Sequence, residues 1–381
     1  MGAPAFDGVT PIADILAYVD RVRAAPALRD GLIDLLTEQG SLYAGRGTVE
    51  TERLRGYLLA SFETTGLPRA AIDFVLEELE SGLNPYTVAA AAKALRGADS
   101  VPERASLLLL KAIKRIRLSD DLVSFEGCCA AASEDSSATA VMEVVRTIAW
   151  LGPRAHAAAA PLRAMVGHAG GGFSAAVQAE IERAIAAVEG GPTGVAHSCC
   201  SQAMDRAAGG EAGRPGASSP DIEGIELEDQ DGSVLTFGAF PYGRPSVVTF
   251  FYTRCMNPEK CSLTVTKLAR LQKSISDQGL HERVNVAAFS YDPAFDLPRR
   301  LRAYGSDRGM TFDAHNRMLR TTGPFEPLQR HFDLGVGYGP ATVNRHRTDV
   351  FVLDAKGEPI FAVARRQWDE AEVLEALKTA L

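Results

Sequence analysis

The segment spanning residues 246–263 constrains the fold more than any other, and it reads Ser-Val-Val-Thr-Phe-Phe-Tyr-Thr-Arg-Cys-Met-Asn-Pro-Glu-Lys-Cys-Ser-Leu. Its apolar run, Val247 to Tyr252, predicts a fully buried strand. Beyond the second cysteine, apolar residues recur at steps of three and four, which predicts a helix. Pro258 disfavours a continuous helix through both cysteines. We therefore place Cys255 and Cys261 on a loop between a buried strand and the start of a helix.

The two thiols of this loop are candidates for redox or metal chemistry. Because a helix N-terminus favours anions, we predict that Cys261, beside Lys260, ionises more easily than a free thiol. Two easily ionised thiols on one loop form a disulfide or hold a soft metal. The remaining interpretation is a pair of unconnected structural cysteines.

The other segments of residues 222–381 complete a pattern of alternating strands and helices. Asp231-Gly232 and the stretch 354–358 each separate two short apolar runs, which predicts two hairpins. A further strand is expected over 284–290, a helix begins near 298, and an amphipathic helix closes the chain at 368–381. The expected architecture is a mixed sheet with helices on both faces.

An ordered set of motifs in this half resembles the Sco/SenC family of thioredoxin-fold copper proteins. After the cysteine loop come Ser-Tyr-Asp-Pro from 290, Gly-Val-Gly-Tyr from 335, and His346 eight residues before Asp354. The resemblance covers about residues 222–381. It implies a thioredoxin-like mixed sheet flanked by helices, and a copper ion bound by Cys255, Cys261 and His346.

The spacing of the cysteines departs from the family pattern. Family members usually have three residues between the two cysteines, whereas this chain has five, and the difference bears on the copper geometry more than on the fold. If the thioredoxin topology holds, His346 lies just before a central strand, at the sheet end that carries the cysteine loop. The alternative is a loop histidine between two cations, Arg345 and Arg347.

Residues 1–190 show helical periodicity with breaks at glycine and proline, and one of the predicted helices spans 28–42. Loosely repeated Ala/Val-rich segments predict a HEAT-like α-solenoid, with a plain helical bundle as the alternative. A solenoid exposes a concave face, so we expect this domain to dock a protein client. His156 and His168 are interpreted as structural or surface residues, and Cys128-Cys129 as small packed residues.

Residues 191–221 are rich in Gly, Ser and Pro and are predicted to form a flexible linker. The linker contains His197-Ser198-Cys199-Cys200. These side chains are candidate auxiliary ligands for a soft metal, or a resolving thiol for Cys255 or Cys261. An accidental cluster near a helix end is the other interpretation.

Charge, apolar segments and cysteine content limit the possible partners and location of the protein. The net charge of −8 argues against nucleic acid, because binding phosphates requires a basic surface. The first residues lack a basic region followed by an apolar core, so we expect no signal peptide. Without an apolar window of about eighteen residues we expect no membrane span and a cytoplasmic location. In a reducing compartment, six cysteines in three close pairs favour metal or redox roles over structural disulfides.

Three functions agree with these observations. The first is a copper-binding metallochaperone that delivers or senses copper, with the helical domain docking the client. The second is a thiol-disulfide oxidoreductase with Cys255 and Cys261 as catalytic thiols. The third is an interaction scaffold without chemistry. His346 favours the first over the second, because thiol exchange does not require it; the sequence does not define the oligomeric state.

Overall fold

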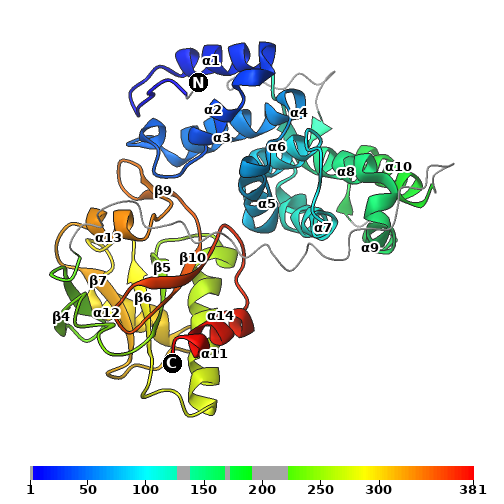
Figure 1. Cartoon of the computed structure of the whole chain (residues 1–381). Coiled ribbons are helices and arrows are strands. Elements are labelled where there is room, and N and C mark those ends of the chain that lie inside the picture. Colours follow the sequence, from blue (N-terminus) through cyan, green and yellow to red (C-terminus); the bar gives the residue numbers. More distant parts are fainter. Residues whose placement is uncertain (1–2, 127–137, 168–171, 191–221) are drawn as a thin grey trace. The chain divides into compact units, whose positions relative to one another are not determined.

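The computed structural model describes residues 3–126, 138–167, 172–190 and 222–381. The chain separates into two compact units, Met1–Cys199 and Cys200–Leu381, which are described separately below (Figure 1). The predicted domain boundaries, with a linker at 191–221, stay a prediction.

The first unit is helical, as the sequence predicts. Its α-helices are α1 (Ile12–Ala24), α2 (Asp30–Asp34), α3 (Thr48–Ala60), α4 (Phe62–Thr65), α5 (Ile72–Ser81), α6 (Pro85–Leu95), α7 (Ala105–Ile116), α8 (Ala140–Leu151), α9 (Ala159–Val166) and α10 (Ala175–Glu189). A two-residue ribbon pairs β1 (Leu122–Val123) with β2 (Ala138–Thr139). The HEAT-like repeat itself stays a prediction.

The helix predicted over 28–42 is wrong, because only Asp30–Asp34 is α-helical there. Side-chain hydroxyl groups donate hydrogen bonds to backbone carbonyls that would accept from backbone N–H groups in a longer helix. The Thr37 hydroxyl donates to the Asp34 carbonyl at 2.9 Å, and the Tyr43 hydroxyl donates to the Leu35 carbonyl at 2.6 Å. These bonds offer the backbone an alternative to continued helical hydrogen bonding.

Helix α6 lies at the centre of the first unit and packs against α3, α5 and α8. Asn84 caps its N-terminus by accepting from the backbone of Tyr86 and Thr87, and Pro85 occupies the first helical position. The alanines at 89–92 and 94 are fully buried. Their small side chains let the neighbouring helices approach closely, which explains the Ala-rich composition of this helix.

The second unit contains a seven-stranded mixed sheet in the order β11-β10-β5-β6-β7-β3-β4. The strands are β3 (Glu226–Asp229), β4 (Val234–Thr236), β5 (Ser246–Phe251), β6 (Asn285–Ser290), β7 (Asn316–Thr321), β10 (Asp349–Leu353) and β11 (Pro359–Ala364). Strands β5, β6 and β7 are parallel to one another, and the remaining pairs are antiparallel. Both predicted hairpins, β3–β4 and β10–β11, are confirmed. The hairpin formed by β8 (Val336–Tyr338) and β9 (Val343–His346) was not predicted.

Helices cover both faces of this sheet (Figure 1). They are α11 (Leu263–Asp277), α12 (Pro298–Ser306), α13 (Glu326–His331) and α14 (Glu370–Thr379). Adjacent residues of a strand point to opposite faces. Phe251 accordingly stacks on Tyr304 of α12, with ring centroids 5.3 Å apart, whereas Phe250 contacts Phe332, at the end of α13, at 5.2 Å. Helices α11 and α14 pack against each other and against β5.

The pairing of β5 with β10 brings distant parts of the chain together. Val350 lies opposite Thr249, and the Thr249 hydroxyl donates to the Asp349 carbonyl at 2.6 Å. Because the two strands are antiparallel, the residues that follow β5 lie beside the residues that precede β10. Among the helices of the described residues, none has the length and apolar character needed to cross a membrane.

Candidate metal centre

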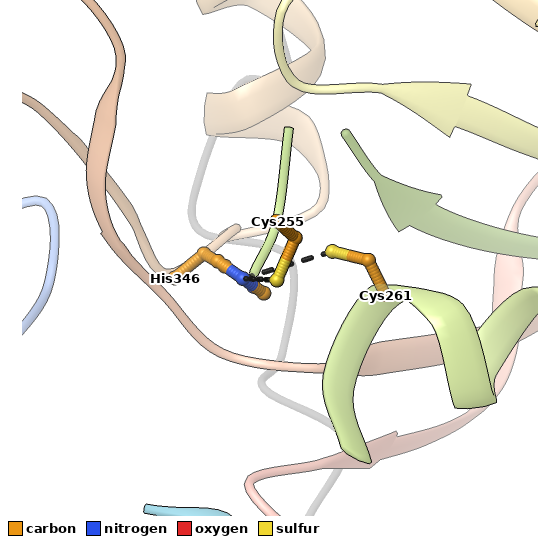
Figure 2. Close-up of side chains that lie close together, drawn as sticks. All are labelled: Cys255, Cys261 and His346. Carbon is orange, nitrogen blue, oxygen red and sulfur yellow. Dashed lines mark hydrogen bonds between the residues drawn. The ribbon is translucent and has the colours of Figure 1, made fainter. Parts of the chain in front are cut away.

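Three soft or borderline donor groups converge where β5 ends. The Nε2 atom of His346 lies 3.4 Å from the Sγ atom of Cys255 and 3.6 Å from the Sγ atom of Cys261. All three donor atoms lie within 4.8 Å of one another. Figure 2 shows the three side chains pointing toward one another. The structure thus brings together the three residues that the sequence analysis selected.

One wide turn accommodates the five residues between the cysteines. Pro258–Ser262 forms a turn of π-helix directly before α11, and Lys260 inside it leaves helical geometry at φ −107° and ψ −110°. Asn257 caps this turn, since its side-chain oxygen accepts from the backbone N–H of Glu259 at 2.9 Å. Such π-turns occur often at functional sites. Here the turn absorbs the longer spacing and still directs Cys261 toward His346.

The imidazole of His346 is buried and held in a defined orientation. Its Nδ1 atom lies 3.0 Å from the backbone carbonyl of Arg347. Because a carbonyl oxygen can only accept, Nδ1 carries a proton in this contact, and Nε2 is the ring atom that faces the thiols. The rings of Tyr252 and Tyr291 enclose the imidazole, at centroid distances of 5.3 and 5.7 Å. His346 is only 6% exposed.

Lys260 ties the cysteine loop to the strand that carries the histidine. Its ammonium group donates to the backbone carbonyl of His346 at 2.7 Å, and the side chain is buried. The sequence analysis treated Lys260 only as a neighbour of Cys261 and missed this structural role. No local sequence signal indicates it, because the contact joins residues 86 positions apart.

The start of the loop is anchored to the segment after β6. Asp296 is fully buried, and its carboxylate accepts from the Thr253 backbone N–H at 3.1 Å, from the Thr253 hydroxyl, and from the Ser290 hydroxyl at 2.6 Å. Burial raises the pKa of this carboxyl group. The next residue, Arg254, forms an ion pair with Asp292 at 2.5 Å. These contacts fix the backbone immediately before Cys255.

The two thiols differ in their tendency to ionise, and the prediction for Cys261 is wrong. Complete burial raises the pKa of Cys261 well above its ordinary value. Cys255 is partly exposed; the hydrogen bond from the Cys261 thiol, together with His346, lowers the pKa of Cys255 to about 3. The helix terminus and Lys260 do not outweigh the loss of hydration at Cys261, because burial disfavours the charged form.

Arg347, the residue that follows His346, is paired with a buried carboxylate. The Nε atom of Arg347 lies 2.8 Å from both carboxylate oxygens of Asp349, which is fully buried. Arg347 also donates to the Asp333 carbonyl. His346 itself is the last residue of strand β9, so it is not the loop histidine of the alternative prediction.

The other candidate residues do not join this cluster. His197, Cys199 and Cys200 lie outside the described residues, as do Cys128, Cys129 and His168. His156 lies in the helical unit, where its Nδ1 atom is 3.4 Å from the Val188 carbonyl. Within the described ranges, Cys255, Cys261 and His346 form the one group of three that could hold a metal ion.

The fold and the cluster together define a class of protein. A mixed sheet with helices on both faces, and two cysteines between the interior strand β5 and helix α11, is a thioredoxin-like fold. Residues 222–381 match the model of the SCO1/SenC family. This match confirms the predicted resemblance for the C-terminal part of the chain.

Several solved structures are similar to part of the chain. A putative electron transfer protein from Aquifex aeolicus VF5 is 18% identical, with a TM-score of 0.37, over 42% of this chain and 91% of that chain. An SCO1/SenC family lipoprotein from Bacillus anthracis str. Ames is 22% identical, with a TM-score of 0.37, over 42% of this chain and 95% of that chain. ScoI from Bradyrhizobium japonicum, solved with copper bound, is 23% identical, with a TM-score of 0.32, over 41% of this chain and 97% of that chain. No curated protein matches the chain.

Proposed function

We propose that this protein binds copper as Cu(I) through Cys255, Cys261 and His346, and that it delivers the ion to a protein client or senses it. The observation that carries the proposal is the convergence of two thiols on the Nε2 atom of one imidazole. Soft thiolate ligands select Cu(I), and an imidazole suits copper in either oxidation state. The match of residues 222–381 to the SCO1/SenC family supports the same ion.

The donor atoms fit such an ion without large rearrangement. Metal bonds to sulfur and imidazole nitrogen are about 2.0–2.3 Å long, so ligand atoms around one ion lie roughly 3.5–4 Å apart. The contacts of His346 Nε2 with both sulfur atoms, 3.4 and 3.6 Å, are close to this range. The bond from Nδ1 to the Arg347 carbonyl keeps Nε2 directed at the ion, as outer-shell hydrogen bonds do in metal sites.

The test is an anaerobic Cu(I) titration of the reduced full chain in competition with a chromogenic Cu(I) chelator. Wild-type protein should bind one ion tightly. We expect Cys255→Ser/Cys261→Ser to lose tight binding, and His346→Ala to lose more than the roughly 10–100-fold typical of an outer-shell change. Binding that survives both changes would overturn the proposed ligand set.

One double variant tests the auxiliary cysteines. We propose that His197, Cys199 and Cys200 act as secondary ligands that hold the ion before or after the main site. Cys199→Ser/Cys200→Ser should lower the total copper capacity and leave the affinity of the main site unchanged. If this variant alone abolished tight binding, the main site would belong to residues 191–221.

The oxidoreductase alternative is not favoured, because thiol exchange does not need an imidazole held against both sulfur atoms. A Cu(I) titration and a thiol-exchange assay on the wild-type protein distinguish the two functions. Absence of tight Cu(I) binding, together with a reversible Cys255–Cys261 disulfide that exchanges with a dithiol, would replace the copper proposal by thiol exchange.

We further propose that the helical unit docks the protein client that gives or receives copper. Its support is the repeat-like pattern of Ala-rich helices, a pattern that provides extended binding surfaces in solenoids. Copper transfer to the client should therefore be slower when residues 1–190 are replaced by an unrelated helical domain. Cell fractionation tests the predicted cytoplasmic location.

A further inference from the structure

The three proposed ligands are not equally accessible from solvent. Cys261 is 0% exposed and His346 is 6% exposed, whereas Cys255 is partly exposed. An incoming ion must therefore reach the site from the side of Cys255. The residue that follows Cys255 is Met256, and its side chain is 89% exposed.

The exposure of Met256 contrasts with the anchoring of the loop around it. The residues before it are held by the Thr253–Asp296 and Arg254–Asp292 contacts, and the residues after it by the Asn257 cap. A loop fixed on both sides holds the Met256 side chain in solvent, in the position next to the partly exposed Cys255. A single exposed apolar side chain needs no explanation by itself. The thioether of Met256, however, is a soft donor group, and it lies next to Cys255, which is the one partly exposed residue among the three proposed ligands.

We propose that the Met256 thioether is a transient Cu(I) ligand through which the ion enters and leaves the buried site, and this inference rests on the copper function proposed above. Thioethers are soft ligands suited to Cu(I). Neighbouring Cα atoms are about 3.8 Å apart, and methionine has three rotatable bonds, so its sulfur can reach an ion bound to Cys255.

The transfer is a ligand exchange in which copper stays Cu(I). The Met256 sulfur donates a lone pair to the incoming ion and releases no proton, because a thioether carries none. The bond to the donor molecule breaks as the bond to Cys255 forms. Cys261 gives up its proton to solvent when it binds, and the Met256 sulfur then leaves. The reverse sequence releases the ion, so a transient ligand accelerates loading and release by the same factor.

The experiment compares wild-type protein with Met256→Leu, which removes the sulfur and keeps an apolar side chain of similar size. Loading from a Cu(I)–chelator complex and removal by excess chelator are followed by stopped-flow absorbance under anaerobic conditions. We expect Met256→Leu to slow both rates about tenfold, equivalent to about 1.4 kcal/mol in the barrier. The equilibrium affinity for Cu(I) should stay unchanged.

One control variant and the wild-type affinity separate the possible outcomes. Leu297→Ala removes a half-exposed apolar side chain next to Asp296 and should leave both rates unchanged. Unchanged rates in Met256→Leu would overturn the inference while wild-type binding still supports the copper function. A weaker equilibrium affinity in Met256→Leu would also overturn it, because Met256 would then be a permanent ligand. Failure of wild-type protein to bind Cu(I) would instead remove the proposed function.

Discussion

The Lys260 ammonium group donates to the backbone carbonyl of His346 at 2.7 Å, and both residues are buried. This bond joins the π-turn between the two cysteines to the end of strand β9. It therefore couples the position of Cys261 to that of the histidine. Outer-shell contacts of this kind orient metal ligands and contribute to metal affinity.

Replacement of Lys260 by methionine should weaken Cu(I) binding about tenfold, because the imidazole is then less firmly held against the thiols. Chelator competition measures the affinity. Lys273→Met is the matched control: Lys273 is 75% exposed and pairs with Asp277 on the outer face of α11. Equal affinities in wild-type protein and Lys260→Met would show that the bond does not support the site.

The thiols should also react differently with an alkylating agent. With a pKa of about 3, Cys255 is a thiolate at every pH above about 5, so its rate with iodoacetamide should be nearly constant from there to about pH 8. The raised pKa and complete burial of Cys261 should make it the slower thiol. Mass spectrometry of the reduced, metal-free protein identifies the labelled residue at each pH.

His346→Ala provides the control for this prediction. Removal of the imidazole takes away one of the groups that lower the pKa of Cys255, so the labelling rate should regain a dependence on pH. Preferential labelling of Cys261 would contradict the assignment. A wild-type rate at Cys255 that rises about tenfold per pH unit near neutrality would contradict it as well.

The parts of the fold that the sequence predicts are those with local signals. The apolar run of β5, the cysteine loop and the buried stripe of α11 needed only periodicity. Strand β7 was missed because its sequence, Asn-Arg-Met-Leu-Arg-Thr, carries two arginines. In the structure Arg317 pairs with Asp229, and Arg320 pairs with Glu228, across the junction with β3. A strand whose charges are neutralised by a neighbouring strand has no recognisable pattern in the sequence.

The residues of the candidate site also differ in whether a local sequence signal indicates them. The two cysteines were predicted as site residues because they lie on a loop between a predicted strand and a predicted helix. His346 was selected only through the family resemblance. Its contact with Cys255 spans 91 positions and depends on the antiparallel pairing of β5 with β10. The direction of the pKa shift at Cys261 was wrong for a related reason. Local charges are visible in the sequence, but burial is produced by the whole fold.

The helical unit contains a buried ion pair that offers a test of its stability. Arg55 and Glu38 are both 0% exposed, and their charged groups lie 3.0 Å apart. Arg55→Met should lower the free energy of unfolding by about 3–5 kcal/mol, because the buried carboxylate loses its cation. Denaturant unfolding followed by the helical circular dichroism signal measures the change.

Arg53→Met, an exposed position on the same helix α3, is the matched control and should shift the unfolding free energy by less than about 0.5 kcal/mol. The double variant Arg55→Met/Glu38→Gln should recover part of the loss, since it removes the buried carboxylate charge as well. If Arg55→Met behaved like Arg53→Met, the pair would not contribute to stability.

His331 should make the stability of the second unit depend on pH. Its ring lies between Phe237 and Phe332, with centroid distances of 6.3 and 4.7 Å, and neither ring nitrogen has a hydrogen-bond partner among the described residues. Burial lowers the pKa of His331 below its ordinary value of 6.5, against a smaller opposing effect of Glu358. Between the folded and unfolded pKa values the unfolded chain therefore binds more protons, so stability is complete above about pH 6.5 and decreases as the pH falls toward the folded value.

Urea unfolding of the reduced, metal-free protein at about pH 7.5 and about pH 5.5 measures this loss, since the two values lie on either side of the ordinary histidine pKa. His331→Phe keeps an aromatic ring in the same apolar site and cannot be protonated, so its stability should fall less over this interval than that of wild-type protein. His281→Gln, at a half-exposed histidine, should retain the wild-type difference between the two pH values. An equal loss in His331→Phe and wild-type protein would assign the pH dependence to other groups, because His331 would then exchange no proton on unfolding.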